Sequence, residues 1–145
     1  MNKPKNTMKV SFPSRGANEG LARMLIAAFV TEADPTVEEL CDIKTAVSEA
    51  VTNCIVHAYP DRIGEIYIAA ALSENNLLTV KVRDHGCGIA DVEQAMEPLY
   101  TTKPEQERSG MGFSFMEAFM DELKVYSGKN SGTTVIMKKR IGVEN

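Results

Sequence analysis

Three side chains that can do chemistry recur every four residues in one stretch of the chain: Glu49, Asn53 and His57. In an α-helix this spacing places a carboxylate, a carboxamide and an imidazole on one face. A separate apolar stripe faces another direction and is formed by Leu40, Val47, Val51, Cys54 and Ala58. A solvated helix surface has the same pattern, so a functional interpretation depends on what the rest of the chain brings to this face.

A first glycine motif follows a predicted strand and contains Asp84, Gly86 and Gly88. Glycines at this spacing let the backbone approach a flat ligand closely or adopt positive φ. An ionised carboxylate beside them can accept a hydrogen bond from an exocyclic amine such as adenine N6. By itself the motif is also consistent with a plain turn. The six-residue dinucleotide fingerprint and the Gly-x-x-x-x-Gly-Lys phosphate loop are absent, so a nucleotide must be held in another way.

A second glycine motif stands where a polar loop gives way to a predicted helix, and it comprises Arg108, Ser109, Gly110 and Gly112. Free N–H groups and the positive end of the helix dipole make such a junction suitable for phosphate. Arg108 and Lys103 add positive charge for a terminal phosphate. A loop with a glycine N-cap is the alternative interpretation.

A third motif is the turn 131–134, whose hydroxyl groups include that of Thr133. It enters the last predicted strand. Its hydroxyls are candidates to join Asp84 at an adenine ring, although a simple turn has the same composition.

Hydrophobic periodicity predicts the elements that position these motifs. The expected strands cover residues 8–12, 63–72, 77–83, 123–126 and 133–138. The expected helices cover residues 17–30, 36–57, 91–96 and 112–120. A capping box, Thr36 to Glu39, starts the long second helix. The segment 97–109 is polar and interrupted by prolines, which favours a mobile loop. The order predicts an α/β two-layer sandwich, with a mixed, mostly antiparallel sheet and helices on one face.

Composition limits the class of protein. The 145 residues are expected to form one domain, 1–145, with 43% hydrophobic and 25% charged residues. The net charge of −4 argues against a nucleic-acid partner. With no long apolar run and no signal peptide, we expect no membrane association and a cytoplasmic location. The three scattered cysteines and two histidines argue against a zinc site or disulfide framework. We expect the cysteines to be small buried hydrophobic residues.

The order of the motifs resembles one family. Glu-x-x-x-Asn on a helix, Asp-x-Gly-x-Gly, a Thr-Thr-Lys loop, Gly-x-Gly before a helix and Gly-Thr-Thr on a strand are typical of one ATP-binding fold. It is shared by gyrase, the Hsp90 chaperones, histidine kinases and MutL proteins. The segments 22–30, 49–53, 98–105, 107–113 and 119–122 resemble the sporulation anti-sigma F factors more narrowly. The resemblance covers roughly residues 8–140.

The resemblance implies a protein serine kinase that uses ATP and Mg²⁺. Glu49 is then the catalytic base and Asn53 the Mg²⁺ ligand, while Asp84 and Thr133 read adenine. Gly86 and Gly88 let the backbone close on the nucleotide. The remaining nucleotide-binding positions are Thr101, Thr102, Lys103, Arg108, Ser109, Gly110 and Gly112. Phosphoryl transfer depends mainly on positioning and charge neutralisation, and a neutral Asn ligand adds no negative charge beside a triphosphate.

The resemblance also implies the partners. As a homodimer, such a protein binds one sigma factor of RNA polymerase and keeps it from the enzyme. It phosphorylates a small anti-anti-sigma antagonist on serine, and ADP release is expected to regulate it. Arg23 corresponds to the residue that contacts protein partners. Two alternatives remain: the equivalent kinase of a stress-response sigma factor, and a nucleotide-gated sigma-binding module without significant kinase activity. Ala58 departs from the family, in which glycine is frequent there, but no role is assigned to it.

Overall fold

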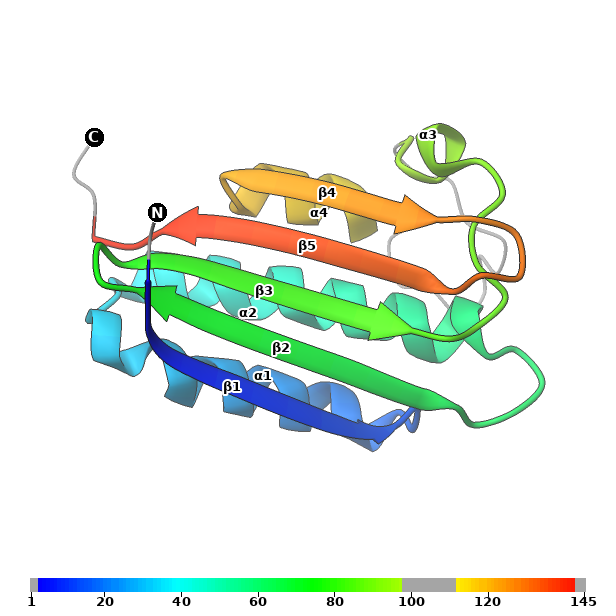
Figure 1. Cartoon of the computed structure of the whole chain (residues 1–145), viewed down its shortest axis with the longest axis horizontal. Coiled ribbons are helices and arrows are strands. Elements are labelled where there is room, and N and C mark those ends of the chain that lie inside the picture. Colours follow the sequence, from blue (N-terminus) through cyan, green and yellow to red (C-terminus); the bar gives the residue numbers. More distant parts are fainter. Residues whose placement is uncertain (1–2, 98–111, 143–145) are drawn as a thin grey trace.

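Five strands form one sheet in the order β1-β2-β3-β5-β4 (Figure 1). The structure is a computed structural model that describes residues 3–97 and 112–142. The strands are β1 (Pro4–Pro13), β2 (Glu65–Ser73), β3 (Leu77–Asp84), β4 (Glu122–Ser127) and β5 (Thr133–Arg140). Side chains alternate between buried and more exposed along β3, as expected for a sheet with one covered face.

The helices lie on one face of this sheet (Figure 1). The described helices are α1 (Ala17–Val30), the short 3₁₀ turn η1 (Thr31–Ala33), α2 (Val37–Asn53), η2 (Cys54–Ala58), α3 (Val92–Ala95) and α4 (Gly112–Phe119). α2 packs between α1 and α4, and the short helix α3 lies near β4. The predicted two-layer α/β sandwich is therefore confirmed.

The pairing of the strands corrects one part of the prediction. All four strand pairs among the described residues are antiparallel, whereas a mixed sheet was expected. The reason is the number of helices between strands. Two helices, α1 and α2, separate β1 from β2, so the chain returns in the opposite direction. β3 and β4 run in the same direction (Figure 1), but β5 lies between them and pairs with both.

α2 begins where the capping box predicts. The Glu39 backbone N–H donates to Thr36 Oγ1 at 3.0 Å, and the Thr36 N–H donates to Glu39 Oε1 at 2.9 Å. These bonds satisfy two donors that a helix start leaves without partners. At the other end, the helical chain continues to Ala58, close to the expected end at His57, but its last turn, η2, is a π-helix. Such turns are often found at functional sites.

The core lies between α2 and the inner face of the sheet. α2 buries one side, formed by Ile43, Ala46, Val47, Ala50 and Val51. The central strands contribute fully or nearly fully buried side chains, including Ile66, Leu78, Val80, Val82 and Met137. Burying a side chain of this size contributes roughly 1.5–3 kcal/mol. This packing fixes the position of α2 on the sheet, and with it the position of Glu49 and Asn53. No helix in the described ranges has the length and apolarity that crossing a bilayer requires.

Candidate functional site

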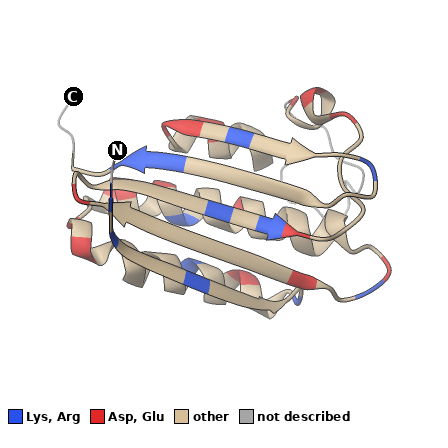
Figure 2. Cartoon of the chain, in the orientation of Figure 1, with Lys and Arg blue, Asp and Glu red and all other residues tan. Residues whose placement is uncertain are grey.

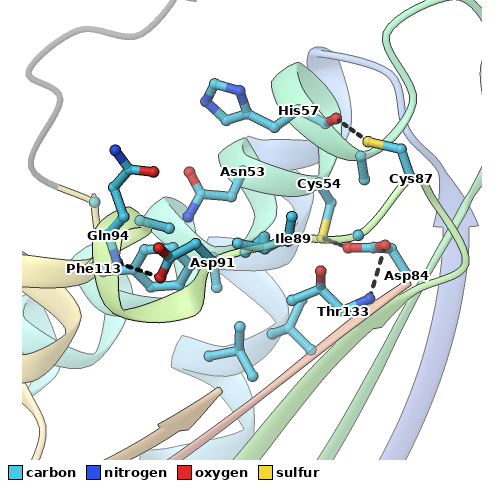
Figure 3. Close-up of a pocket in the computed structure, with 18 of the residues that line it drawn as sticks. Asn53, Cys54, His57, Asp84, Cys87, Ile89, Asp91, Gln94, Phe113 and Thr133 are labelled. Carbon is cyan, nitrogen blue, oxygen red and sulfur yellow. Dashed lines mark hydrogen bonds between the residues drawn. The ribbon is translucent and has the colours of Figure 1, made fainter. Parts of the chain in front are cut away.

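A pocket of about 320 Å³ opens at the end of α2. It lies between η2, the loop after β3, α3, the start of α4 and the start of β5. Figure 3 shows Asp84 beside Cys54 and Thr133, with Asn53 and Gln94 farther along the pocket. The apolar part of its lining includes Ala50, Val82, Ile89, Ala95, Phe113 and Val135. A concave, mainly apolar lining with few polar groups is typical of a small-molecule site.

Asp84 is the buried polar residue at one end of this pocket, with only 4% of its surface exposed. Its Oδ1 accepts from the backbone N–H of Gly86 at 2.9 Å and of Thr133 at 3.2 Å. Its Oδ2 accepts from the thiol of Cys54 at 3.4 Å. These three donors fix the carboxylate and leave Oδ2 with acceptor capacity for one amine of a ligand.

Cys54 remains a thiol in this environment. Burial, followed by the nearby charge of Asp84, raises the pKa of Cys54 well above its ordinary value. The sulfur therefore keeps its proton and serves as a donor to Asp84.

Gly86 and Gly88 hold the loop after β3 against the rest of the fold. A Cβ on Gly86 would lie 2.2 Å from the Ala58 carbonyl oxygen. Gly88 has φ +76°, and a Cβ there would lie 1.9 Å from the Gly128 carbonyl oxygen. Both sites thus require glycine for close backbone packing. Gly88 lines the pocket, whereas the tight contact of Gly86 is with the end of η2.

Thr133, for which an adenine-reading role was predicted, lines the pocket next to Asp84. Its hydroxyl lies 2.8 Å from Ser127 Oγ. Ser127 Oγ also donates to the Gly132 carbonyl at 2.8 Å and accepts from the Ile89 N–H at 2.7 Å. The Ser127 hydroxyl therefore connects β4, β5 and the glycine loop at this end of the site.

Tyr59 anchors the same loop from the other side. Its buried hydroxyl donates to the Glu65 carbonyl at 2.7 Å and accepts from the His85 N–H at 2.7 Å. The Cys87 N–H donates to the Ala58 carbonyl at 2.9 Å. The end of η2 and the segment 85–87 are thus joined through the Tyr59 hydroxyl and through a backbone bond.

Gly112, at the start of α4, brings together the two residues of α2 predicted to act in catalysis and metal binding. A Cβ on Gly112 would lie 3.3 Å from Glu49 Oε2 and 3.5 Å from both terminal atoms of Asn53. Asn53 and Gly112 line the pocket, and Glu49 reaches the same glycine from one helical turn earlier. His57, one turn later, also lines the pocket, and its carbonyl accepts from the Cys87 thiol at 3.2 Å.

Arg23 lies on α1, outside the pocket lining. Its Nε forms an ion pair with Glu19 Oε1 at 3.0 Å, with 45% of the Arg23 side chain exposed. The hydroxyl of Ser48 donates to the same Glu19 carboxylate. Because Ser48 precedes Glu49 in the sequence, α1 and the site helix are joined next to the predicted base.

Six predicted positions lie outside the described residues, and so does most of the expected loop 97–109. The positions are Thr101, Thr102, Lys103, Arg108, Ser109 and Gly110. Of the predicted positions that the structure describes, five line the pocket and come from separate parts of the chain: Asn53, Asp84, Gly88, Gly112 and Thr133. Glu49, Gly86 and Arg23 are not among its lining residues.

The expectation that all three cysteines are buried is wrong for two of them. Cys54 is buried, whereas Cys41 and Cys87 are exposed. Cys41 lies on the solvent side of α2, and Cys87 lies in the loop after β3. The sequence reasoning also missed the bond from Cys54 to Asp84 and the hydroxyls of Ser127 and Tyr59. The one signal available was the position of Cys54, directly after Asn53 on the helix.

The fold and site correspond to a known family. The model of the histidine kinase-like ATPase domain matches residues 12–139, and the chain belongs to this family. Among solved structures, the RsbU and RsbW domains of a Mycobacterium tuberculosis protein match with a TM-score of 0.69 and 21% identity, over 95% of this chain and 33% of that one. A blue-light activated histidine kinase from Erythrobacter litoralis matches with a TM-score of 0.56 and 22% identity, over 85% of this chain and 61% of that one. At these identities the likeness concerns the fold.

Curated relatives indicate a narrower class of proteins within this family. An anti-sigma F factor of Caldanaerobacter subterraneus subsp. tengcongensis is 56% identical over 94% of this chain and 95% of its own length. An anti-sigma F factor of Clostridium perfringens is 54% identical over 94% of this chain and 97% of its own length. The resemblance to anti-sigma F factors that the motifs predicted is thereby confirmed.

Proposed function

We propose that this protein is an anti-sigma factor that also phosphorylates its antagonist on serine with Mg-ATP. The first half of the proposal is supported by the names of relatives that are about half identical over nearly the whole chain. The second half is supported by the site itself. The observation that carries it is the meeting of Glu49 and Asn53 at Gly112, the residue that starts α4.

The described residues fit a nucleotide. The fixed carboxylate of Asp84 has acceptor capacity for the exocyclic amine of adenine, and the apolar walls suit the flat ring. A pocket of about 320 Å³ falls within the usual range for small-molecule sites. ATP and ADP present the same adenine to Asp84, so the fit holds for both.

Asn53 is the residue we assign to Mg²⁺, through its side-chain oxygen. Mg²⁺ prefers oxygen ligands and binds commonly through one or two protein groups together with phosphate oxygens and water. When bound, the ion neutralises charge on the phosphates that are transferred. A neutral amide does this without adding a negative charge next to them.

Glu49 is the residue we assign to proton transfer. Its carboxylate lies one turn before Asn53 and against the start of α4. A carboxylate at that place can accept the proton of a serine hydroxyl as the oxygen attacks. The antagonist, a small anti-anti-sigma protein, supplies that serine, and the sigma factor and antagonist use a surface that includes Arg23. We include a homodimer and a cytoplasmic location in the proposal.

The test is a phosphotransfer assay with labelled Mg-ATP and the small antagonist. We expect acid-stable phosphoserine on the antagonist with the wild-type protein. Glu49→Gln should lower the transfer rate about 10²–10⁴-fold and leave ATP binding and sigma binding intact, since the base acts in the chemical step. Glu38→Gln, in the first turn of α2, removes the same charge far from the pocket and is the matched control.

Each other outcome identifies a different function. Absence of transfer with ATP bound and sigma captured would indicate a nucleotide-gated binding module. Transfer together with capture of a stress-response sigma factor instead of the sporulation one would indicate the equivalent stress-response kinase. Equal transfer by Glu49→Gln and wild type would show that the assignment of the base is wrong.

A further inference from the structure

The outer face of the sheet carries a charge opposite to that of the whole chain. The helices lie behind the sheet, so the described part of the chain leaves this outer face uncovered (Figure 1). Strand register places Lys9, Ala69, Lys81, Ile136 and Lys124 in one row across the outer face. The next row comprises Ser11, Tyr67, Arg83, Thr134 and Tyr126, and the row on the other side ends with Lys138 and Glu122.

On the strands in this view, basic residues lie on β1, β3, β4 and β5, while the acidic residues of the strands stand near strand ends (Figure 2). The whole chain has a net charge of −4. Glu122 forms ion pairs with two of the cations, because its carboxylate lies 3.5 Å from the ammonium of Lys124 and 3.8 Å from that of Lys138. Three other cations in the first two rows, Lys9, Lys81 and Arg83, are exposed and have no ion-pair partner among the described residues.

These three cations border a strip of small side chains on β2. Ala69 lies opposite Lys9 on one side and opposite Lys81 on the other. Two residues on, Ala71 lies between the threonines Thr7 and Thr79. The larger side chain of Tyr67, two residues before Ala69, flanks these alanines and is 40% exposed. Lys9 and Lys81 are two strand spacings apart, which is about 10 Å. A helix with its side chains is about 10–12 Å across, so one lying along β2 would have a cation on each flank.

We propose that this basic face binds an acidic amphipathic helix of a protein partner. The apolar stripe of that helix lies on Ala69, Ala71 and Tyr67. Its flanking carboxylates pair with Lys9 on one side and with Lys81 and Arg83 on the other. This surface is distinct from the pocket and from Arg23, which belongs to α1 in the helical layer.

A nucleic acid fits these observations less well. A protein that makes roughly 6–10 phosphate contacts needs about as many cations, and the two rows described above hold three unpaired ones. The net negative charge of the chain repels a polyanion at long range. Ala69 and Ala71 offer apolar contact to a helix stripe and no hydrogen bond to phosphate.

The probe for this proposal is a fluorescein-labelled amphipathic peptide of leucine, alanine and glutamate, with glutamates on both flanks of the apolar stripe. A twin peptide with lysines in place of the glutamates is the charge control, and an oligothymidylate is the nucleic-acid control. Binding is followed by fluorescence anisotropy at two salt concentrations. We expect the glutamate peptide to bind, less tightly at high salt, and neither control to bind.

The matched variants are Lys9→Gln/Lys81→Gln/Arg83→Gln on the face and Arg15→Gln/Lys44→Gln/Lys129→Gln elsewhere. Both sets remove three positive charges. The face variant should weaken peptide binding about tenfold, since three exposed pairs each contribute modestly. The affinity of the second variant for the peptide should remain within about twofold of that of the wild type. Thermal unfolding of each variant verifies the fold.

Three results would overturn the proposal: no binding of the glutamate peptide at about 1 mM, equal weakening by both variants, or tighter binding of the oligothymidylate. The third would assign the face to a nucleic acid. Because the assay involves neither ATP nor the antagonist, its failure leaves the kinase proposal untouched, and failure of phosphotransfer leaves this one untouched.

Discussion

The thiol of Cys54 donates a hydrogen bond to Asp84 Oδ2 across 3.4 Å, joining the end of the site helix to the end of a central strand. Together with two backbone N–H groups, it fixes the carboxylate that we assign to the adenine amine. Cys54 is thus a positioning residue, since it acts on the ligand through Asp84.

Cys54→Ala removes this donor. We expect ATP to bind about threefold to tenfold more weakly, in keeping with the modest net value of one hydrogen bond. Cys54→Ser restores a donor and should recover most of the affinity. Titration calorimetry with ATP and with purine riboside triphosphate, which lacks the exocyclic amine, separates positioning from general damage. The alanine variant should bind the amine-free analogue as tightly as wild type does, and a parallel loss with both nucleotides would contradict the positioning role.

The same thiol predicts a pH dependence of stability. Burial and the charge of Asp84 raise the pKa of Cys54 in the folded protein. Above about pH 8.5 the unfolded chain loses this proton while the folded protein keeps it. Rising pH therefore favours the unfolded state, and stability falls from that pH upward. The free energy of unfolding, measured in urea between pH 7 and 10, should fall less steeply in Cys54→Ala. Equal slopes in wild type and Cys54→Ala would show that folding does not raise the pKa of this thiol.

Gly88→Ala should destabilise the protein through backbone packing. Alanine there would be strained by the positive φ, and its Cβ would meet the Gly128 carbonyl oxygen at 1.9 Å. Gly142 has φ +78° with no heavy atom within 4 Å of an added Cβ, so Gly142→Ala isolates the conformational cost. We expect about 1 kcal/mol for Gly142→Ala and at least about 2 kcal/mol more for Gly88→Ala, from urea unfolding. Similar losses of stability in the two variants would show that the backbone at Gly128 moves aside at little cost.

Tyr59→Phe should loosen the glycine loop. The change removes the hydroxyl that accepts from His85 and donates to Glu65, and leaves both backbone groups without this partner. We expect a loss of about 1–3 kcal/mol in stability, together with weaker nucleotide binding. Tyr126→Phe is the control, since Tyr126 is 56% exposed and surface changes are usually within about 0.5 kcal/mol. Unchanged nucleotide affinity in Tyr59→Phe would show that the loop needs no anchor.

Local signals in the sequence were sufficient for the elements. The predicted helix 17–30 coincides with α1, and the capping box from Thr36 to Glu39 starts α2 as expected. Alternation placed the strands to within a few residues. These features depend on residues close together in the chain, so periodicity and capping chemistry reveal them.

What the sequence did not reveal depends on contacts between distant residues. The bond from Cys54 to Asp84 spans 30 positions, and nothing in the sequence near either residue indicates the other. The antiparallel pairing of β3 and β4 with β5 follows from the place of β5 between them, which is a property of the whole sheet. The exposure of Cys87 follows from the path of the glycine loop.

The bond from the Thr133 N–H to Asp84 Oδ1 has a consequence for folding. It joins residues 49 positions apart, at the end of the β3–β5 pair, and Cys54 must arrive from a third segment. The adenine end of the pocket is therefore complete only after β5 has joined the sheet. A partly folded chain without β5 lacks this end, so we expect nucleotide to bind to the native state and not to its precursors. We therefore expect ATP to raise the melting temperature of the protein, because a ligand that binds only the native state stabilises it.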